Sequence, residues 1–290
     1  EIKNIKRVNN RKMKPGLYIV GTPIGNLDDV SIRSQNVLNS VDQIICENPK
    51  HSIKLLSKFG IKKKMYSLHD HNEDEIIKKI GNIATSSRIA LISDAGSPLI
   101  SDPGFKLVRF YIENKINISV VPGPSAIISA LQLSGMPAHS FKFLGFLPKN
   151  KKGILDFIKN IENEELTSVF FVSTHRVKIC IETISKYLAD REISICKELT
   201  KLNEKVFRGS PKNIILEFEK DKKNNLGEFV FLVSGKNKEN DYKKLSDELL
   251  DKQIGKLLNK FSLTDVVEIV HKLTNISKKI IYKKVLDQKK

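Results

Sequence analysis

Apolar and polar positions repeat one pattern between residues 17 and 147: a short apolar run, a loop rich in Gly, Pro, Ser or Asp, and then an amphipathic stretch of helical period. The predicted strands lie at 17–20, 41–46, 89–92 and 118–121. The predicted helices lie at 31–40, 105–113 and 127–133. This alternation is typical of an α/β fold with a mainly parallel sheet.

A second α/β domain is predicted to follow the charged stretch 149–152, which has the composition of a linker. Its predicted strands lie at 168–172, 193–197, 205–208 and 228–233. Residues 211–219 fit a helix with Pro in its first turn, and 221–225 fit a polar loop. We therefore expect two α/β domains in succession.

The pattern changes after residue 234 to a Lys-rich and helical one. Residues 236–290 contain 14 Lys, no Arg and 8 acidic residues. Ser262 is expected to cap a helix that ends at Leu273, Asn275 to turn the chain, and 277–286 to form another helix. This arrangement is helix-turn-helix-like, and an ordinary helical hairpin packed on the second domain fits the pattern equally well.

These patterns predict four parts along the 290 residues. They are a basic, flexible N-terminus (1–15), an N-terminal α/β domain (16–144), a second α/β domain (145–235) and the helical tail (236–290). The length of the chain agrees with two α/β domains, because domains average roughly 150 residues.

Charge and composition narrow the function. The 50 Lys and Arg against 33 Asp and Glu give a net charge of +17, which attracts polyanions such as nucleic acid, although only 8 of these cations are Arg and a compositional bias fits too. No apolar run approaches the roughly 18 residues of a membrane span, so we expect a cytoplasmic protein without a membrane partner. The three Cys lack paired spacing, which disfavours disulfides and zinc.

Candidate chemistry lies in the Gly/Pro loops that follow the predicted strands. In a parallel sheet these loops gather at one edge, where ligands bind. The sequence contains neither G-x-G-x-x-G nor G-x-x-x-x-G-K-[ST], so the usual dinucleotide and triphosphate loops are excluded. The loops are suited to holding another kind of small ligand.

The combination of motifs resembles one known family. The motifs are, in order, GTPIGNL (21–27), LHDHN (68–72), SDAGSPLI (93–100), DPG (102–104), VPGP (121–124), GFLP (145–148) and STHR (173–176). Together they are similar to the ribosomal RNA small subunit methyltransferase I family, of the tetrapyrrole methylase superfamily, over residues 16–290. The resemblance implies two α/β domains with a cofactor cleft between them and a small C-terminal helical segment. It also implies transfer of a methyl group from S-adenosylmethionine to a cytidine 2′-hydroxyl of 16S rRNA in the small ribosomal subunit, by a homodimer.

The resemblance also implies which residues bind the cofactor: Pro23, Ala95, Gly96, Ser97, Ile100, Ser125, Ala126, Val172 and Thr200. Proton transfer from a ribose hydroxyl needs a nearby base. The candidates, which follow predicted strands or come from the second domain, are Glu47, His51, Asp94, Asp102 and His175. No metal site is expected, because His69 and His71 lack partners at ligand spacing.

Cations are expected to hold RNA phosphates. The proposed residues are Lys50, Lys149, Lys151, Lys152, Arg176, Lys201, Lys205, Arg208, Lys278, Lys279, Lys283 and Lys284. For each one, a solvated surface charge is an equally simple interpretation. Phe146 and Phe207 are the candidates for stacking on exposed bases.

The chain departs from the family pattern at several positions, and two alternatives stay open. Residues 47–51 read ENPKH where the family has Glu-Asp-Thr-Arg-His, and Val172, Lys197 and Leu226 replace a family Glu, Arg and Lys. Such losses would fit an RNA-binding relative without catalysis. A tetrapyrrole methylase of the same fold is the other alternative, disfavoured by the basic tail and by the absence of Gly-Pro-Gly-Asp from the first loop.

Overall fold

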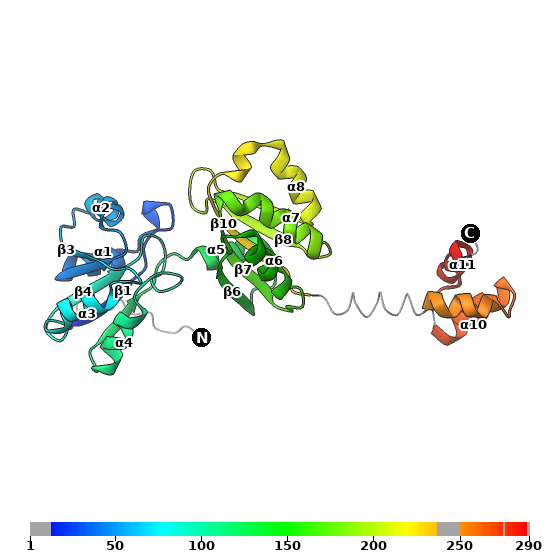
Figure 1. Ribbon diagram of the computed structural model, residues 1–290, viewed down its shortest axis with the longest axis horizontal. Helices are drawn as coiled ribbons and strands as arrows, with labels where there is room; N and C mark the ends of the chain where they lie inside the picture. The colour runs from blue at the N-terminus through cyan, green and yellow to red at the C-terminus, as the bar shows by residue number, and fades with distance from the viewer. Residues whose placement is uncertain (1–12, 237–249, 275, 289–290) are drawn as a thin grey trace. The chain divides into compact units, whose positions relative to one another are not determined.

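The α/β alternation produces two five-stranded sheets in the computed structural model, which describes residues 13–236, 250–274 and 276–288. The chain divides between Gly235 and Lys236 into two compact units. Both sheets belong to the first unit, and the second is helical (Figure 1). Within the described residues, no helix has the length and apolar character needed to cross a lipid bilayer.

The first sheet is parallel throughout, with the strand order β3-β2-β4-β1-β5. Its strands are β1 (Gly16–Val20), β2 (Gln43–Cys46), β3 (Lys64–Ser67), β4 (Arg88–Ile92) and β5 (Ile118–Val121). Its connections contain η1 (Leu27–Asp29), α1 (Ile32–Ser40), α2 (Pro49–Lys58), α3 (Glu73–Gly81) and α4 (Phe105–Glu113). The loops after β1, β4 and β5 therefore gather at one edge, as the sequence predicts.

Both faces of this sheet are buried. Ala90 and Ile92 of β4 belong to a core with α1 and α2, whereas Ile89 and Leu91 belong to a core with α3 and α4. Because a strand covered on both faces has no polar side, residues 89–92 form a continuous apolar run.

The second sheet is mixed, with the order β6-β7-β10-β8-β9 and a parallel pairing between β6 and β7. Its strands are β6 (Phe141–Phe146), β7 (Thr167–Ser173), β8 (Ile193–Lys197), β9 (Lys205–Gly209) and β10 (Glu228–Val233). The helices are α6 (Lys151–Asn160), α7 (Val177–Tyr187) and α8 (Pro211–Lys220), with the short turns η2 (Thr174–Arg176) and η3 (Lys222–Asn225). The three helices share one core with one face of the sheet.

Two expectations about the start of this domain are corrected. Residues 149–152 are not a linker, because Lys151 and Lys152 begin α6, which Asn150 caps by accepting the Gly153 N–H at 2.7 Å. The boundary expected between 144 and 145 falls inside β6, which pairs with β7. The second sheet therefore begins at Phe141, before the glycine and proline that indicated a domain boundary.

The opposite face of the second sheet is covered by α5 (Ala126–Ser134), the helix that leaves the last strand of the first sheet. Ala130 and Leu131 of α5 are 0% and 4% exposed and share a core with Val169, Val230 and Leu232 of the second sheet. Figure 1 shows α5 beside the second sheet, where it contacts β10, β8 and β9. The two α/β lobes are therefore joined by a common core.

The tail forms its own core. A helical segment at 250–258, α10 (Leu263–Thr274) and α11 (Lys278–Gln288) bury Ile254, Val266, Val270 and Ile281 against one another. The expected cap is confirmed, since Ser262 Oγ accepts the Asp265 N–H at 3.3 Å. The expected turn residue Asn275 and most of the expected flexible N-terminus (1–12) lie outside the described residues.

We predict that Leu131→Ala lowers the free energy of unfolding by about 2–5 kcal/mol, because it opens a cavity in the core that joins the two lobes. Urea denaturation followed by circular dichroism measures the change. Leu202→Ala is the matched control, since Leu202 is 99% exposed and its truncation should change stability by less than about 0.5 kcal/mol. Equal stabilities for the two variants would contradict the role given to α5.

Candidate functional site

A cavity of about 420 Å³ lies where the loops of the first sheet meet one end of the second. From the first lobe it is lined by Ile24, 94–97, 100–102 and 125–127. From the second lobe it is lined by Phe146, 171–174, Leu199 and 227–230. A volume of a few hundred Å³ with mixed apolar and polar walls is typical of small-molecule sites.

Two close approaches bring the first-lobe loops together. Thr22 and Gly96 exchange backbone hydrogen bonds, with Thr22 N donating to Gly96 O at 2.8 Å and Gly96 N to Thr22 O at 3.1 Å. Gly21 lies against Gly123, so close that a Cβ on Gly21 would be 2.7 Å from the Gly123 Cα. Side chains other than hydrogen would separate these loops, which explains the glycines in these motifs.

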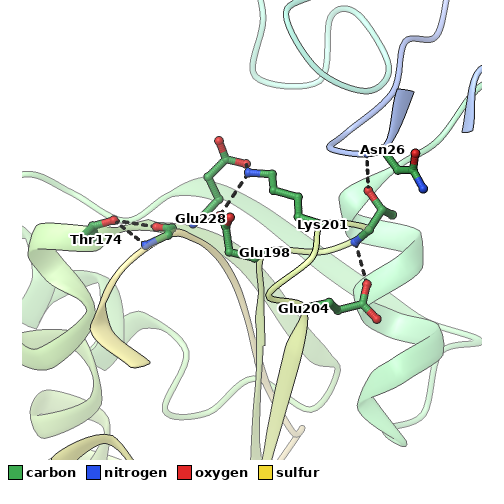
Figure 2. A network of polar contacts seen from close by, with 8 residues as sticks. Asn26, Thr174, Glu198, Lys201, Glu204 and Glu228 are labelled. Carbon is green, nitrogen blue, oxygen red and sulfur yellow. Dashed lines mark hydrogen bonds and ion pairs between the residues drawn. The ribbon is translucent and has the colours of Figure 1, made fainter. Parts of the chain in front are cut away.

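The second-lobe wall is held by an ion-pair network (Figure 2). Lys201 Nζ lies 3.1 Å from Glu198 Oε1 and 2.9 Å from Glu228 Oε2, and Glu198 Oε1 also accepts the Glu228 N–H at 2.8 Å. Although burial raises the pKa of Glu198, these hydrogen bonds and the Lys201 charge outweigh it and lower that pKa below its usual value. Glu198 therefore stays ionised and fixes the end of β10 beside the cavity.

The same network reaches the first lobe. Thr200 Oγ1 accepts the Asn26 N–H at 3.0 Å, and Thr200 N donates to Glu204 Oε2 at 2.6 Å (Figure 2). Gly25 packs so closely there that a Cβ on it would lie 2.8 Å from Thr200 Oγ1. The loop after β1 thus bonds directly to the second lobe, next to the cavity residues Ile24 and Leu199.

Three carboxylates gather at the first-lobe side. Burial and the neighbouring charge of Glu47 raise the pKa of Asp102 to about 6, against a hydrogen bond from Ser93. Burial and the charge of Asp94 likewise raise the pKa of Glu47. Because the three groups repel one another, this side of the cavity favours a cation or the release of one proton.

Seven of the nine residues expected to bind the cofactor line the cavity: Ala95, Gly96, Ser97, Ile100, Ser125, Ala126 and Val172. In the described part of the chain, Pro23 and Thr200 do not line it, but each precedes or follows a lining residue, Ile24 or Leu199. The structure thus brings together segments that are far apart in the sequence, since the lining residues extend from Ile24 to Val230.

The acid–base candidates separate into two groups. Asp94 and Asp102 line the cavity, and Glu47 influences Asp102 through its charge. His51 and His175 are exposed and do not contribute to the cavity in the described structure. Among the residues described, no group of three His, Cys, Asp or Glu is arranged to hold a metal ion.

Several cations expected to face RNA have partners within the protein. Arg176 donates to Ser173 Oγ and Leu147 O, Arg208 to Leu133 O, and Lys205 to Asn224 Oδ1. Lys201, Lys278 and Lys284 form ion pairs with nearby carboxylates. The remaining residues are exposed on the surface: Lys50, Lys149, Lys151, Lys152, Lys279 and Lys283.

The stacking candidates also differ. Phe207 is 1% exposed within the helix-covered core, so the expectation that it meets RNA bases is wrong. Phe146 is 58% exposed and lines the cavity.

Sequence reasoning missed part of the second-lobe wall, in particular Phe171, Leu199 and 227–230. Phe171 and Val230 lie in apolar strands that read as core, and the β7–β10 pairing that places them together joins residues about 60 positions apart. Gly227, directly before β10, is a local sequence signal of this wall, because its φ of +123° is a backbone conformation that favours glycine.

The chain is similar in sequence to a known family of methylases. Residues 16–215 match the family of Tetrapyrrole (Corrin/Porphyrin) Methylases. The chain is 42% identical over 223 residues to Ribosomal RNA small subunit methyltransferase I of Thermotoga maritima, covering 76% of this chain and 98% of the relative. It is 38% identical over 276 residues to the protein of the same name from Escherichia coli O157:H7, covering 94% and 95%.

Solved structures show the same fold. Diphthine synthase superposes with a TM-score of 0.57 at 14% identity, covering 75% of this chain and 89% of that one. Uroporphyrin-III-C-methyltransferase from Thermus thermophilus gives a TM-score of 0.51 at 16% identity, covering 76% and 94%. The α/β fold expected from the sequence is thereby confirmed.

We predict that Asp102→Asn flattens the pH dependence of stability. Because the folded-state pKa of about 6 exceeds the ordinary 3.8, the folded protein binds the proton more tightly, and the free energy of unfolding falls as pH rises from about 4 to 6. At pH 7.5 the variant should be more stable than the parent by about 1 kcal/mol, allowing for solvent screening of a half-buried group. Urea titrations at pH 4.5 and 7.5 measure this. Asp190→Asn, at an exposed position, is the control, and an unchanged pH slope in Asp102→Asn would refute the prediction.

Proposed function

This chain belongs to the tetrapyrrole methylase family and, within it, to the ribosomal RNA small subunit methyltransferase I proteins, and on that premise we propose that it methylates ribosomal RNA with S-adenosylmethionine as donor. We place the methyl group on the 2′-oxygen of a cytidine in 16S rRNA, within the small ribosomal subunit. The observation that carries the proposal is the cavity between the lobes, lined by seven of the nine residues expected to bind the cofactor.

The cavity walls fit this cofactor. S-adenosylmethionine is a small molecule with an adenine ring whose flat faces suit apolar contacts, a positively charged sulfonium and an amino-acid end. Ile24, Ile127 and Val230 offer apolar surface, and the carboxylates Asp94 and Asp102 favour positive charge. The N-terminal turn of α5, which begins at Ala126 after the cap Ser125, offers backbone N–H groups to a carboxylate. The residues present therefore suit each part of the molecule.

The chain's own contribution to transfer is to orient the reactants and exclude water. When bound, S-adenosylmethionine supplies an electrophilic methyl group. The rigid loops, held by the Thr22–Gly96 hydrogen bonds and by the Asn26–Thr200 bond, keep the cavity in one shape, so the acceptor oxygen is met in a fixed direction. Methyl transfer of this type needs no metal ion.

Asp102 is the residue that we assign to hold the proton released from the 2′-hydroxyl, on its carboxylate oxygens. It lines the cavity, and a pKa of about 6 leaves it ionised at neutral pH yet close enough to that pH to accept a proton. Asp94 lines the same side and is the second candidate. Exposed His51 and His175 are assigned instead to contacts with RNA.

The net charge of +17 supports an RNA substrate, because it draws a polyanion to the protein before any specific contact forms. Exposed Lys50, Lys149, Lys151 and Lys152 lie on the first unit, and Lys279 and Lys283 lie on the tail, which we propose binds RNA as a helix-turn-helix-like module. We further propose that the protein acts in the cytoplasm as a homodimer.

The tetrapyrrole alternative is weaker. The relatives that bear the ribosomal RNA name share about 40% identity with this chain, whereas the porphyrin-type enzyme of the same fold shares 16%. The non-catalytic alternative predicts salt-sensitive RNA binding without affinity for S-adenosylmethionine, and the open cavity of about 420 Å³ favours an enzyme that binds the cofactor.

We expect the purified chain to transfer one labelled methyl group from S-adenosylmethionine to small ribosomal subunits that lack the modification. Nucleoside digestion and mass spectrometry should identify 2′-O-methylcytidine. A base-methylated nucleoside would contradict the 2′-O assignment, and methylation of a tetrapyrrole acceptor instead of RNA would support the alternative.

Ala126→Leu tests whether the cavity binds the cofactor, because the larger side chain fills the space beside Ser125. Calorimetry should show at least about a tenfold loss of cofactor affinity, equivalent to about 1.4 kcal/mol. Ile128→Leu, at an exposed position of the same helical turn, is the matched control. Unchanged cofactor affinity in Ala126→Leu would place the cofactor elsewhere.

The tail lysines give a prediction about RNA affinity. Replacing exposed Lys279 and Lys283 with Ala should weaken binding to 16S rRNA and make the plot of log affinity against log salt shallower by about 1 to 2, because two phosphate contacts are lost. Filter binding at several salt concentrations measures the slope. Lys63→Ala together with Lys115→Ala on the first sheet's lobe serves as the charge-matched control, and equal slopes for both pairs would remove the tail from the RNA site.

A further inference from the structure

The position of Phe146 results from a β-bulge at the end of β6. Phe143 pairs with Val169 and Phe146 with Phe171, so three steps along β6 match two along β7. Gly145, with φ +71°, supplies the extra residue. A bulge of this kind changes the face on which the following side chain lies.

Without the bulge, Phe146 would lie on the helix-covered face. Leu144 packs against the core of α6, α7 and α8, and strict alternation would place Phe146 on the same side two residues later. Instead its ring lies 5.0 Å from the ring of Phe171, a residue of the opposite face, and both line the cavity. The bulge thus moves an aromatic side chain from a core position to the cavity.

Arg176 holds this turn in place. Its guanidinium donates to Leu147 O at 2.7 Å and to Ser173 Oγ at 2.6 Å, and Leu147 N donates to Phe171 O at 2.8 Å. The residue directly after Phe146 is therefore tied to β7 and to η2. These bonds make Arg176 a positioning residue for Phe146.

Exposure distinguishes Phe146 from the other aromatic residues of the cavity. Among the described residues three Phe residues line it; Phe229 is 3% exposed and packs in the helix-covered core, while Phe171 is half-buried. Phe146 is 58% exposed, although folding normally buries so large an apolar ring. Because Phe146 lines the cavity and is also mostly exposed, we infer that its ring belongs to the rim, or mouth, of the cavity.

We propose that Phe146 is the platform on which the base of the target nucleotide stacks while its ribose enters the cavity, an inference that rests on the proposed function. A cavity of about 420 Å³ is near the lower end of the range for small-molecule sites, so one cofactor occupies it and the acceptor nucleoside stays at the mouth. RNA-modifying proteins hold unpaired bases on exposed aromatic faces. Phe146 lines the same cavity as Asp102, and its neighbour Gly145 lies near Ser101, since a Cβ on Gly145 would be 3.9 Å from Ser101 Oγ.

Kinetics test the platform. Phe146→Leu keeps an apolar side chain but removes the ring, and it should lower kcat/KM for unmodified small subunits about 5- to 150-fold, the range for loss of one base–aromatic stack. The cofactor dissociation constant from calorimetry should stay within about twofold, and Phe146→Tyr should recover much of the lost transfer. Phe105→Leu makes the same exchange at an exposed Phe that starts α4 and should leave transfer unchanged.

A second measurement does not require transfer. The chain contains no Trp, so Phe146→Trp introduces a single fluorophore at the mouth of the cavity. Saturating cytidine oligoribonucleotide, with saturation followed by the anisotropy of labelled RNA, should quench this fluorescence. Leu216→Trp on the far, helix-covered side of the second sheet is the control and should not be quenched.

The outcomes separate the two proposals. Quenching of Phe146→Trp with loss of kcat/KM in Phe146→Leu supports the platform. If Phe146→Leu weakens cofactor binding as strongly as transfer, Phe146 contacts the cofactor and the platform is overturned. Wild-type transfer together with an unquenched Phe146→Trp at saturation also overturns it. If the wild type transfers no methyl group to small subunits, the proposed function fails, whatever the fluorescence shows.

Discussion

The cavity depends on the packing of α5 against the second sheet. This helix follows the last strand of the first sheet, yet Ala130 and Leu131 are buried among strands of the second. Its first turn, with Ser125 and Ala126, lines the cavity, and Ile127 belongs to both the cavity and the shared core. One helix therefore joins the lobes and forms part of the binding surface, so any change that loosens the shared core also changes the shape of the site.

Charge is distributed unevenly in a way that suits the proposed reaction. The chain carries a net charge of +17, but carboxylates gather at the cavity, where burial and the charges of Glu47 and Asp94 raise the pKa of Asp102 to about 6. At physiological ionic strength the Debye length is about 8 Å, so an exposed charge acts mainly on groups within that distance. Surface lysines therefore attract the RNA phosphates that approach them, whereas the carboxylates repel phosphates from the cavity. The backbone of the RNA is thus held outside, and a sugar hydroxyl is the part that enters. Lys201 does not attract phosphates into the cavity, because its positive charge is neutralised by ion pairs with Glu198 and Glu228.

The sequence predicted those elements whose surroundings in the fold produce a recognisable pattern in the local sequence. Strands such as β4, buried on both faces, appear as continuous apolar runs, and the glycine loops reveal the first-lobe half of the site. β3 was missed because none of its residues is fully buried and it contains two polar positions, and β6 because the Gly145 bulge resembles a turn. The second-lobe half depends on strand pairings between distant residues. Arg176 and Arg208, which the sequence predicted to bind RNA, donate to the backbone oxygens of Leu147 and Leu133, and no sequence pattern reveals such contacts.

The departures from the family pattern acquire a physical meaning in the structure. Val172, in place of a family Glu, belongs to the cavity wall but packs at 2% exposure in the helix-covered core, so a carboxylate there would be desolvated. Lys197, in place of an Arg, is buried, and its ammonium donates a hydrogen bond to Lys223 O. A single carbonyl acceptor suits the Lys ammonium and does not require the two-pronged geometry of an Arg guanidinium. Leu226 lies outside the cavity at 60% exposure. Each substitution is accommodated locally, and none closes the cavity, so the changes that favoured a non-catalytic relative in the sequence do not remove the physical basis for catalysis.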